Sequence, residues 1–170
     1  MPRQAIRILG IDPGLRTTGW GLIEAEGSRL SFVACGTITS DAATLLGERL
    51  RALHIGLSAI VADHQPDEAA IEETFVNRDP QSALKLGHAR AIGMVVPALA
   101  GITVHEYAAN LVKKTVVGVG HADKRQVATM IRILLPRSDA KSADAADALA
   151  IAICHAQHRV ARMMQARALA

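Results

Sequence analysis

Aromatic side chains are scarce in this chain of 170 residues, which has only Trp20, Phe32, Phe75 and Tyr107. The core must therefore be aliphatic, and an aromatic side chain outside it needs a reason. Cysteine is also rare: Cys35 and Cys154 show no spacing typical of metal ligands and read as buried thiols in apolar settings. We therefore expect a reducing, cytoplasmic location.

Long apolar runs are absent as well. No run reaches the roughly 18–20 residues that a membrane span needs. The opening MPRQAIRILGID leads into a strand-like segment without the apolar stretch and cleavage site of a signal peptide. Half of the residues are apolar, which predicts a globular chain with a proper core. We expect one domain over residues 1–159 and a basic, loosely ordered tail over 160–170.

Charge is unevenly distributed although the net charge is only +3. Residues 113–141 hold seven Lys and Arg against two Asp, whereas residues 61–112 hold three basic residues against seven acids. This pattern favours an anion-binding surface next to a cation-binding spot, with a solvated charge run as the alternative.

The pattern of apolar residues predicts a mixture of strands and helices. Short apolar runs bounded by turn residues predict strands at 6–12, 17–25, 30–39, 68–75 and 102–107, the second and third joined by a turn at 26–28. Helical spacing predicts helices at 41–64, 79–100, 108–116, 123–135 and about 142–159, with Ser40 or Asp41 capping the first. Three hairpin strands followed by alternating helices and strands predict an α/β domain, with a mixed five-stranded sheet and helices on both faces.

Two acidic residues lie in predicted strands. Asp12 ends the first strand in the turn sequence Asp-Pro-Gly, where its side chain has the alternative role of capping the turn. Glu72 lies in EAAIEETF, where alternation forces Glu72 or the adjacent Glu73 to face a covering layer. The alternative is an edge strand with both glutamates partly solvated.

Two further acids begin the last predicted helix. Asp144 and Asp147 stand three positions apart and so share one helix face. The helix dipole favours acids in a first turn, which explains one aspartate more easily than two before so apolar a continuation. If the first and fourth strands are neighbours, Asp12 and Glu72 can meet this pair. Four converging carboxylates need cations, and oxygen-only ligands select Mg²⁺ or Mn²⁺.

The order of several motifs resembles one family. These motifs are LGIDPG (9–14), TGWG (18–21), AIEETF (70–75), SALKLGHARA (82–91), EYAANLVKKTVVGVG (106–120), ADKRQV (122–127) and ADAADALAIAI (143–153). Together they resemble the RuvC-type Holliday-junction resolvases over about residues 6–158.

The resemblance implies a ribonuclease H-like fold and a homodimer that nicks opposing strands of four-way junction DNA, leaving 5′-phosphate and 3′-hydroxyl ends. It also implies a branch-migration helicase complex as partner. The family's four catalytic, metal-binding acids match Asp12, Glu72, Asp144 and Asp147. They would hold two Mg²⁺ ions per subunit, with Mn²⁺ as a plausible substitute.

The same resemblance gives other residues a role. Phe75 matches an aromatic that stacks on unpaired bases, for which a core position is the alternative. Lys113 and Lys124 match lysines that hold phosphates, and Lys114 and Arg125 are expected to help or to be merely solvated. The second helix would supply part of the dimer interface. His88 stands where the family commonly has Gln, which bears on packing there.

Three other functions are alternatives to that of a junction resolvase. They are a nuclease of the same fold acting on structured RNA, a non-catalytic junction-binding module, and an actin-like ATP-binding domain. The module predicts a missing carboxylate, and the actin-like fold needs a second glycine-rich phosphate loop that 170 residues do not supply. The seven histidines show no ligand spacing, so we interpret each as surface or structural.

Overall fold

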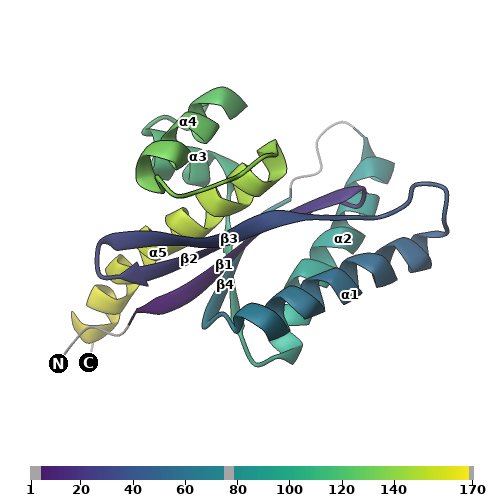
Figure 1. The fold of residues 1–170 in the computed structure, drawn as a ribbon, viewed down its shortest axis with the longest axis horizontal. Helices are drawn as coiled ribbons and strands as arrows, with labels where there is room; N and C mark the ends of the chain where they lie inside the picture. Colours follow the sequence, from purple (N-terminus) through teal and green to yellow (C-terminus); the bar gives the residue numbers. More distant parts are fainter. Residues whose placement is uncertain (1–4, 75–78, 169–170) are drawn as a thin grey trace.

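The computed structural model describes residues 5–74 and 79–168 and places one sheet between two layers of helices (Figure 1). Its elements are β1 (Ile6–Asp12), β2 (Thr17–Glu26), β3 (Arg29–Thr39), α1 (Leu46–His64), β4 (Glu68–Glu72), α2 (Pro80–Leu99), β5 (Thr103–Tyr107), α3 (Ala109–Val117), α4 (Lys124–Leu134) and α5 (Ala143–Ala168). This is the mixed α/β architecture that the sequence pattern predicts.

The sheet has the strand order β3-β2-β1-β4-β5. Strand β2 runs antiparallel to both β1 and β3, while β1, β4 and β5 run parallel to one another. The β2–β3 turn contains Gly27 at a φ of 62°, a left-handed conformation that glycine adopts without steric cost. The first and fourth strands are therefore neighbours, as the convergence of the acids requires.

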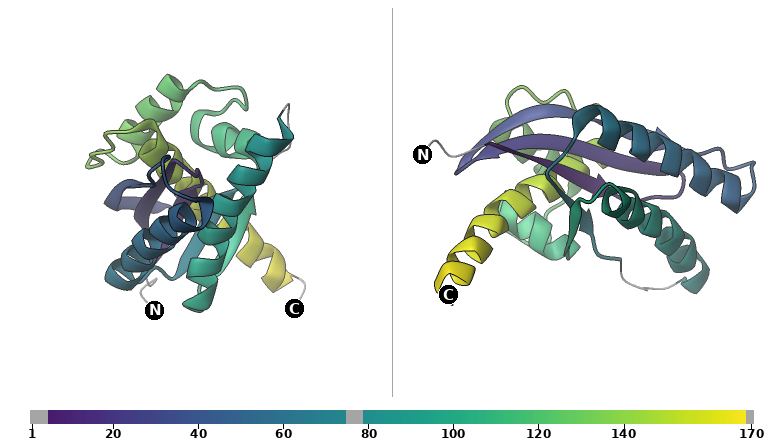
Figure 2. Two further views of the ribbon diagram at one scale, coloured as in Figure 1. Left: turned by 90° about the vertical axis from the view of Figure 1, so that its right-hand side faces the viewer. Right: turned by 90° about the horizontal axis from the view of Figure 1, so that it is seen from below.

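Alternation along β1 divides the core into two layers. Leu9 and Ile11 face the side covered by α1 and α2, whereas Ile8 faces the side covered by α5. Helices α3 and α4 pack beside α5 on that second side, which Figures 1 and 2 show from three directions. Side chains of β1 that share the face of Ile8, including Asp12, therefore point toward α5.

Glycines let the backbone of α5 lie directly on the sheet. A Cβ atom at Gly10 would stand 2.0 Å from the carbonyl oxygen of Ala148. One at Gly19 would stand 2.1 Å from the carbonyl oxygen of Asp144. These approaches are too close for any side chain, so the two glycines fix how near α5 comes to β1 and β2. We call this pair of contacts the glycine track.

The first helix starts later than predicted. Helix α1 begins at Leu46, after a turn in which the Asp41 carboxylate accepts a hydrogen bond from the backbone N–H of Ala43. Thr44 donates its backbone N–H and its hydroxyl to the Asp41 carbonyl. Local side-chain hydrogen bonds of this kind compete with helix formation. The predicted capping role of Ser40 or Asp41 is therefore wrong.

Two other boundaries also differ from the prediction. Strand β4 ends at Glu72 because its parallel partner β5 ends at Tyr107, the residue that pairs with Glu72. Helix α5 continues past Arg159 to Ala168, so residues 160–168 of the expected loose tail are helical. That segment, VARMMQARA, consists mostly of strong helix formers and lacks Gly and Pro, which explains the extension.

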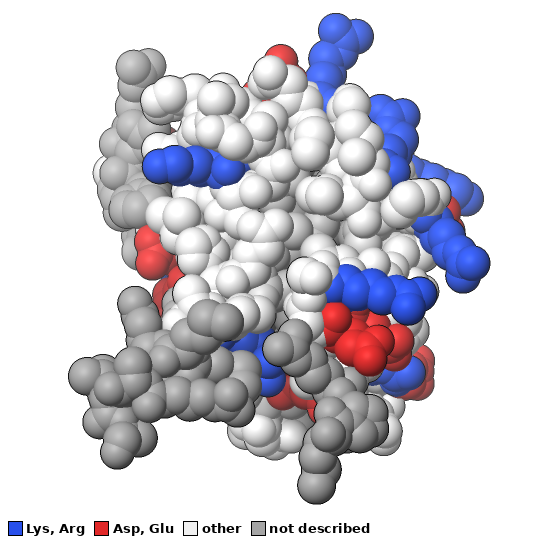
Figure 3. Space-filling view, turned by 90° about the vertical axis from the view of Figure 1, so that its left-hand side faces the viewer, with Lys and Arg blue, Asp and Glu red and all other residues white. Residues whose placement is uncertain are grey.

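Charged side chains gather unevenly on the surface. In the face shown in Figure 3, Lys and Arg side chains project mainly from the upper right, and the largest group of acidic atoms lies below them. Such separation suits binding of a charged partner better than a uniformly mixed surface does. Among the described residues, no helix has both the length and the apolar character required to cross a membrane.

Candidate active site

Two of the predicted acids lie at the same edge of the sheet. The parallel register aligns Ile11 of β1 with Ile71 of β4, and the next residue along each strand is Asp12 or Glu72. Since side chains at equivalent positions of parallel neighbours point the same way, both carboxylates face α5. On the other side of β1, Asp12 pairs with Gly19, whose missing side chain leaves room for the helix above.

The start of α5 brings the other two acids to the same place. The Ser142 hydroxyl accepts a hydrogen bond from the Ala145 backbone N–H at 3.1 Å, which fixes where the helix begins. Asp144 then lies with its backbone against Gly19, and Asp147 follows three residues later on the same face. The structure therefore brings together all four acids that the sequence singles out.

Burial and the neighbouring negative charges raise the pKa of three of the four carboxylates. Burial is the main cause that raises the pKa of Asp12 to about 8, and the charges of Asp147, Glu72 and Asp144 raise it further. Burial likewise raises the pKa of Glu72 and of Asp147. The cluster thus concentrates more negative charge than its surroundings compensate, and it favours uptake of protons or cations.

Two lysines partly offset this charge from the helices above the site. Lys124 opens α4 and places its Nζ 3.7 Å from an oxygen of Asp147. A capping box fixes this helix start, because Asp123 and Gln126 each accept a backbone N–H of the other at 2.9 Å. Lys113 of α3 joins Lys124 in lowering the pKa of Glu72 and Asp147, so both cations lie near the acids.

A basic cleft of about 760 Å³ extends from Lys124 between α4 and the start of α5. Its charged lining consists of Lys124, Arg125, Arg132, Asp139 and Lys141. None of the four acids lines it, so the cleft adjoins the acidic cluster rather than containing it. Arg125 lines this cleft beside Lys124, and Lys114 is exposed on α3, so the roles predicted for both at the DNA stay predictions.

The donor atoms of the acidic cluster fit hard divalent cations. All four side chains offer only carboxylate oxygen, which Mg²⁺ and Mn²⁺ prefer over softer ligands. The raised pKa values of three of them indicate that the cluster is electrostatically incomplete without positive charge. The residues present therefore fit a divalent metal site.

Some features of the site were not anticipated from the sequence. Arg90 of α2 donates from Nε to the backbone carbonyl of Glu72 at 3.0 Å, and it also pairs with Glu106 of β5. This side chain anchors the end of β4 from the helix opposite α5. Phe75 lies outside the described residues, so its predicted role in base stacking stays a prediction.

The raised pKa of Asp12 predicts that the metal-free protein loses stability as pH rises. Because the folded-state pKa of about 8 exceeds the ordinary aspartate pKa of 3.8, the folded form binds the extra proton between these two pH values. The free energy of unfolding should fall by roughly 3–5 kcal/mol from pH 4 to pH 8, since a tenfold change in proton affinity is worth about 1.4 kcal/mol. Urea unfolding in the presence of a chelator, at several pH values between 4 and 8, measures this change in unfolding free energy.

Asp12→Asn provides the matched comparison for this pH dependence. The amide does not titrate, so most of the fall in unfolding free energy between pH 4 and pH 8 should disappear in the variant. Equal pH dependence in both proteins would show that Asp12 does not hold the extra proton.

Several known proteins similar to this chain belong to one family. The sequence profile of the family described as "Crossover junction endodeoxyribonuclease RuvC" matches residues 8–155. A protein of that name from Methylocella silvestris is 67% identical over 164 residues, covering 96% of this chain and 93% of that protein. Another from Methylorubrum extorquens is 63% identical over 162 residues, covering 95% and 86% respectively.

Solved structures give the same result for the fold. The structure of Thermus thermophilus RuvC in complex with Holliday junction substrate superposes with a TM-score of 0.84 and 30% identity, covering 91% of this chain and 94% of that chain. The yeast mitochondrial Holliday junction resolvase Ydc2 superposes with a TM-score of 0.65 at 12% identity, which supports the fold alone. The expected ribonuclease H-like architecture is thus confirmed.

Proposed function

Because the chain belongs to the RuvC family of crossover junction endodeoxyribonucleases, we propose that it resolves four-way DNA junctions by hydrolysing phosphodiester bonds in opposing strands. The products are nicks with 5′-phosphate and 3′-hydroxyl ends. The observation that carries this proposal is the meeting of Asp12, Glu72, Asp144 and Asp147 at one edge of the sheet, beside Lys113 and Lys124.

The four carboxylates are the proposed ligands of Mg²⁺, with two ions per subunit and Mn²⁺ as a substitute. Bound divalent ions would activate water and stabilise the leaving oxygen of a phosphodiester. Asp12 lies between Glu72 and the α5 pair, which suits it to contact both ions. The rigid attachment of these side chains to β1, β4 and the capped start of α5 keeps them in position before substrate arrives.

The cations above the acids are the proposed DNA contacts. Lys113 and Lys124 offer point charges that hold backbone phosphates without reading sequence. Lys124 now pairs with Asp147 at 3.7 Å and is 72% exposed, so a phosphate can compete for it at low cost. Arg125 continues this path into the basic cleft, Lys114 is a weaker candidate, and Phe75 is proposed to stack on unpaired bases.

A homodimer is the proposed form of the enzyme. On α2, Leu84, Val95 and Leu99 are 65%, 47% and 77% exposed and lie on one side of the helix at helical spacing. An apolar stripe of this kind suits burial against a second copy. Two active sites in one dimer would then cut opposing strands. We further propose a branch-migration helicase complex as partner, the cytoplasm as location, and residues 1–159 as the nuclease domain.

Cutting of a synthetic immobile junction tests the proposed function. With Mg²⁺ present, we expect cuts in two opposing strands at symmetric positions and products that DNA ligase can seal. Without Mg²⁺ we expect binding and no cuts. Duplex DNA and structured RNA of matched length serve as controls, because the rival RNA nuclease would cut the RNA and spare the junction. Denaturing gels that resolve each labelled strand give the lengths and positions.

A further inference from the structure

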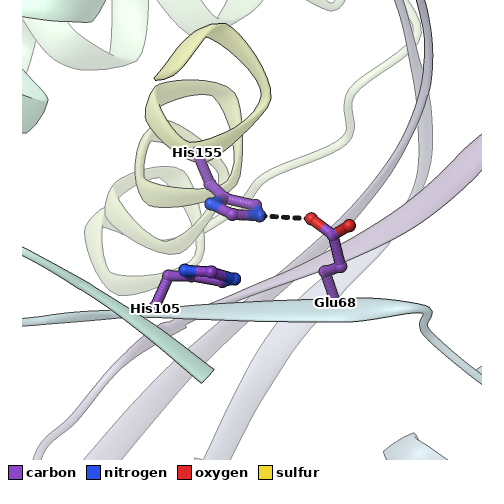
Figure 4. Close-up of side chains that lie close together, drawn as sticks. All are labelled: Glu68, His105 and His155. Carbon is purple, nitrogen blue, oxygen red and sulfur yellow. Dashed lines mark hydrogen bonds and ion pairs between the residues drawn. The ribbon is translucent and has the colours of Figure 1, made fainter. Parts of the chain in front are cut away.

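A second group of possible metal ligands lies at the opposite end of β4 from Glu72. Glu68, His105 and His155 come from β4, β5 and α5, and each offers a ligand atom within 4.8 Å of the others (Figure 4). Glu72 is four positions along the extended strand from Glu68, or about 13 Å away. The group is therefore separate from the acids of the proposed active site.

His155 is the centre of this group and is only 1% exposed. Its Nε2 lies 2.7 Å from an oxygen of Glu68, and its Nδ1 lies 2.8 Å from the hydroxyl of Tyr107. The His105 ring stacks on it with centroids 4.5 Å apart and planes tilted by 26°. In the imidazole rings of both His105 and His155, one of the two nitrogens lies on the side of the ring that faces Glu68 (Figure 4). Three donor side chains from three elements thus point to one place.

We propose that Glu68, His105 and His155 bind one borderline transition-metal ion such as Zn²⁺. Two imidazole nitrogens and one carboxylate oxygen form a ligand set that suits Zn²⁺ and leaves a fourth position for water. Mg²⁺ prefers oxygen ligands and is a poor match for the two histidines. The ion replaces the proton on His155 Nε2, and small rotations of the partly exposed Glu68 and His105 side chains close the site.

Neighbouring side chains hydrogen-bond to two of the three ligands and hold their orientation, as the neighbours of metal ligands commonly do. Tyr107 can accept a hydrogen bond from Nδ1–H of His155, which leaves Nε2 for the ion. Arg159 contacts both oxygens of Glu68, at 2.7 and 2.9 Å, and keeps one of them when the other binds metal.

The positive charge of Arg159 limits how tightly the ion is held, because two cations then share one carboxylate. The site is therefore expected to be weaker than a closed structural zinc site. An ion there ties α5 to β4 and β5 and stabilises the folded protein by mass action. This role is independent of DNA cleavage.

Titration with Zn²⁺ in excess Mg²⁺ tests the proposal, because Mg²⁺ occupies oxygen-only sites and leaves the histidines available. Calorimetry of the full-length protein should show one equivalent of Zn²⁺ bound. His105→Phe, which retains an aromatic ring but no ligand nitrogen, and Glu68→Gln should each weaken binding at least tenfold. Circular dichroism checks that both variants fold.

Two control variants test whether Zn²⁺ binds at the proposed site or elsewhere on the protein. His88→Ala removes an exposed histidine on α2, and Asp147→Asn removes one acid of the proposed active site. Both should bind Zn²⁺ as the unmodified protein does. Lack of saturable Zn²⁺ binding, or equal affinity in His105→Phe and the unmodified protein, would overturn the proposal. So would loss of the bound equivalent in Asp147→Asn.

Discussion

Replacing Asp12 with asparagine should lower junction cleavage by about 10³-fold or more while leaving junction binding intact. The amide keeps the size of the side chain but removes the charge at the centre of the four acids. Charge stabilisation by bound metal is worth several kcal/mol in the transition state, and each 1.36 kcal/mol is tenfold in rate. Binding survives because the contacts to phosphate come from the lysines, and removing an anion also weakens repulsion of DNA.

Single-turnover cleavage of a labelled junction and a gel-shift titration measure the two quantities separately. Asp63→Asn is the matched control, since Asp63 is exposed on α1, across the sheet from the acids. It should cut at the normal rate. If Asp12→Asn still cuts within tenfold of the unmodified rate in Mg²⁺, the assignment of the catalytic acids is wrong.

Replacing Gly10 with alanine should destabilise the protein by about 3 kcal/mol or more, at the upper end of overpacking substitutions. The added Cβ would stand 2.0 Å from the carbonyl oxygen of Ala148 and 2.8 Å from the backbone nitrogen of Ala152. These are backbone atoms of a buried helix and cannot rotate away, so α5 must move off the sheet. That movement also shifts Asp144 and Asp147, and we expect cleavage to fall with stability.

Gly47→Ala is the control for this substitution. Gly47 lies in the first turn of α1, and a Cβ there meets nothing within 4 Å. Its free energy of unfolding should stay within about 1 kcal/mol of the unmodified protein, as the helix propensities of Gly and Ala predict. Urea unfolding of both variants at one pH measures the difference. Equal stability of Gly10→Ala and Gly47→Ala would mean that α5 does not depend on the close approach.

Local sequence patterns were sufficient to predict the types and order of the elements. Alternation and turn residues predict the β2–β3 hairpin, and helical spacing predicts α2 and the end of α1 closely. The boundaries that differ depend on partners that the local pattern does not contain. Strand β4 ends where β5 ends, and α1 begins only after Asp41 has formed its own turn.

The acids of the site were predictable because each stands at a position of local significance. Asp12 ends a predicted strand, alternation places Glu72 or Glu73 toward a covering layer, and Asp144 and Asp147 open a helix bound for the core. The glycine track was not predictable, since it depends on which helix crosses which strand. The same holds for His105 and His155, which stand 50 positions apart in the sequence and so show no ligand spacing. Only the pairing of β4 with β5 and the path of α5 bring them together with Glu68.

The glycine track also fixes the two ends of α5 to different degrees. Its contacts lie at Asp144 and Ala148, close to the start of the helix. His155 lies seven residues beyond Ala148, or about 10 Å along the axis at 1.5 Å per residue, so a tilt of about 5° around Ala148 would move it by roughly 0.9 Å. Asp144, in contrast, is held directly against Gly19. Since catalytic groups must be held within about 0.5 Å, the track keeps the carboxylates in place while the far end of α5 adjusts.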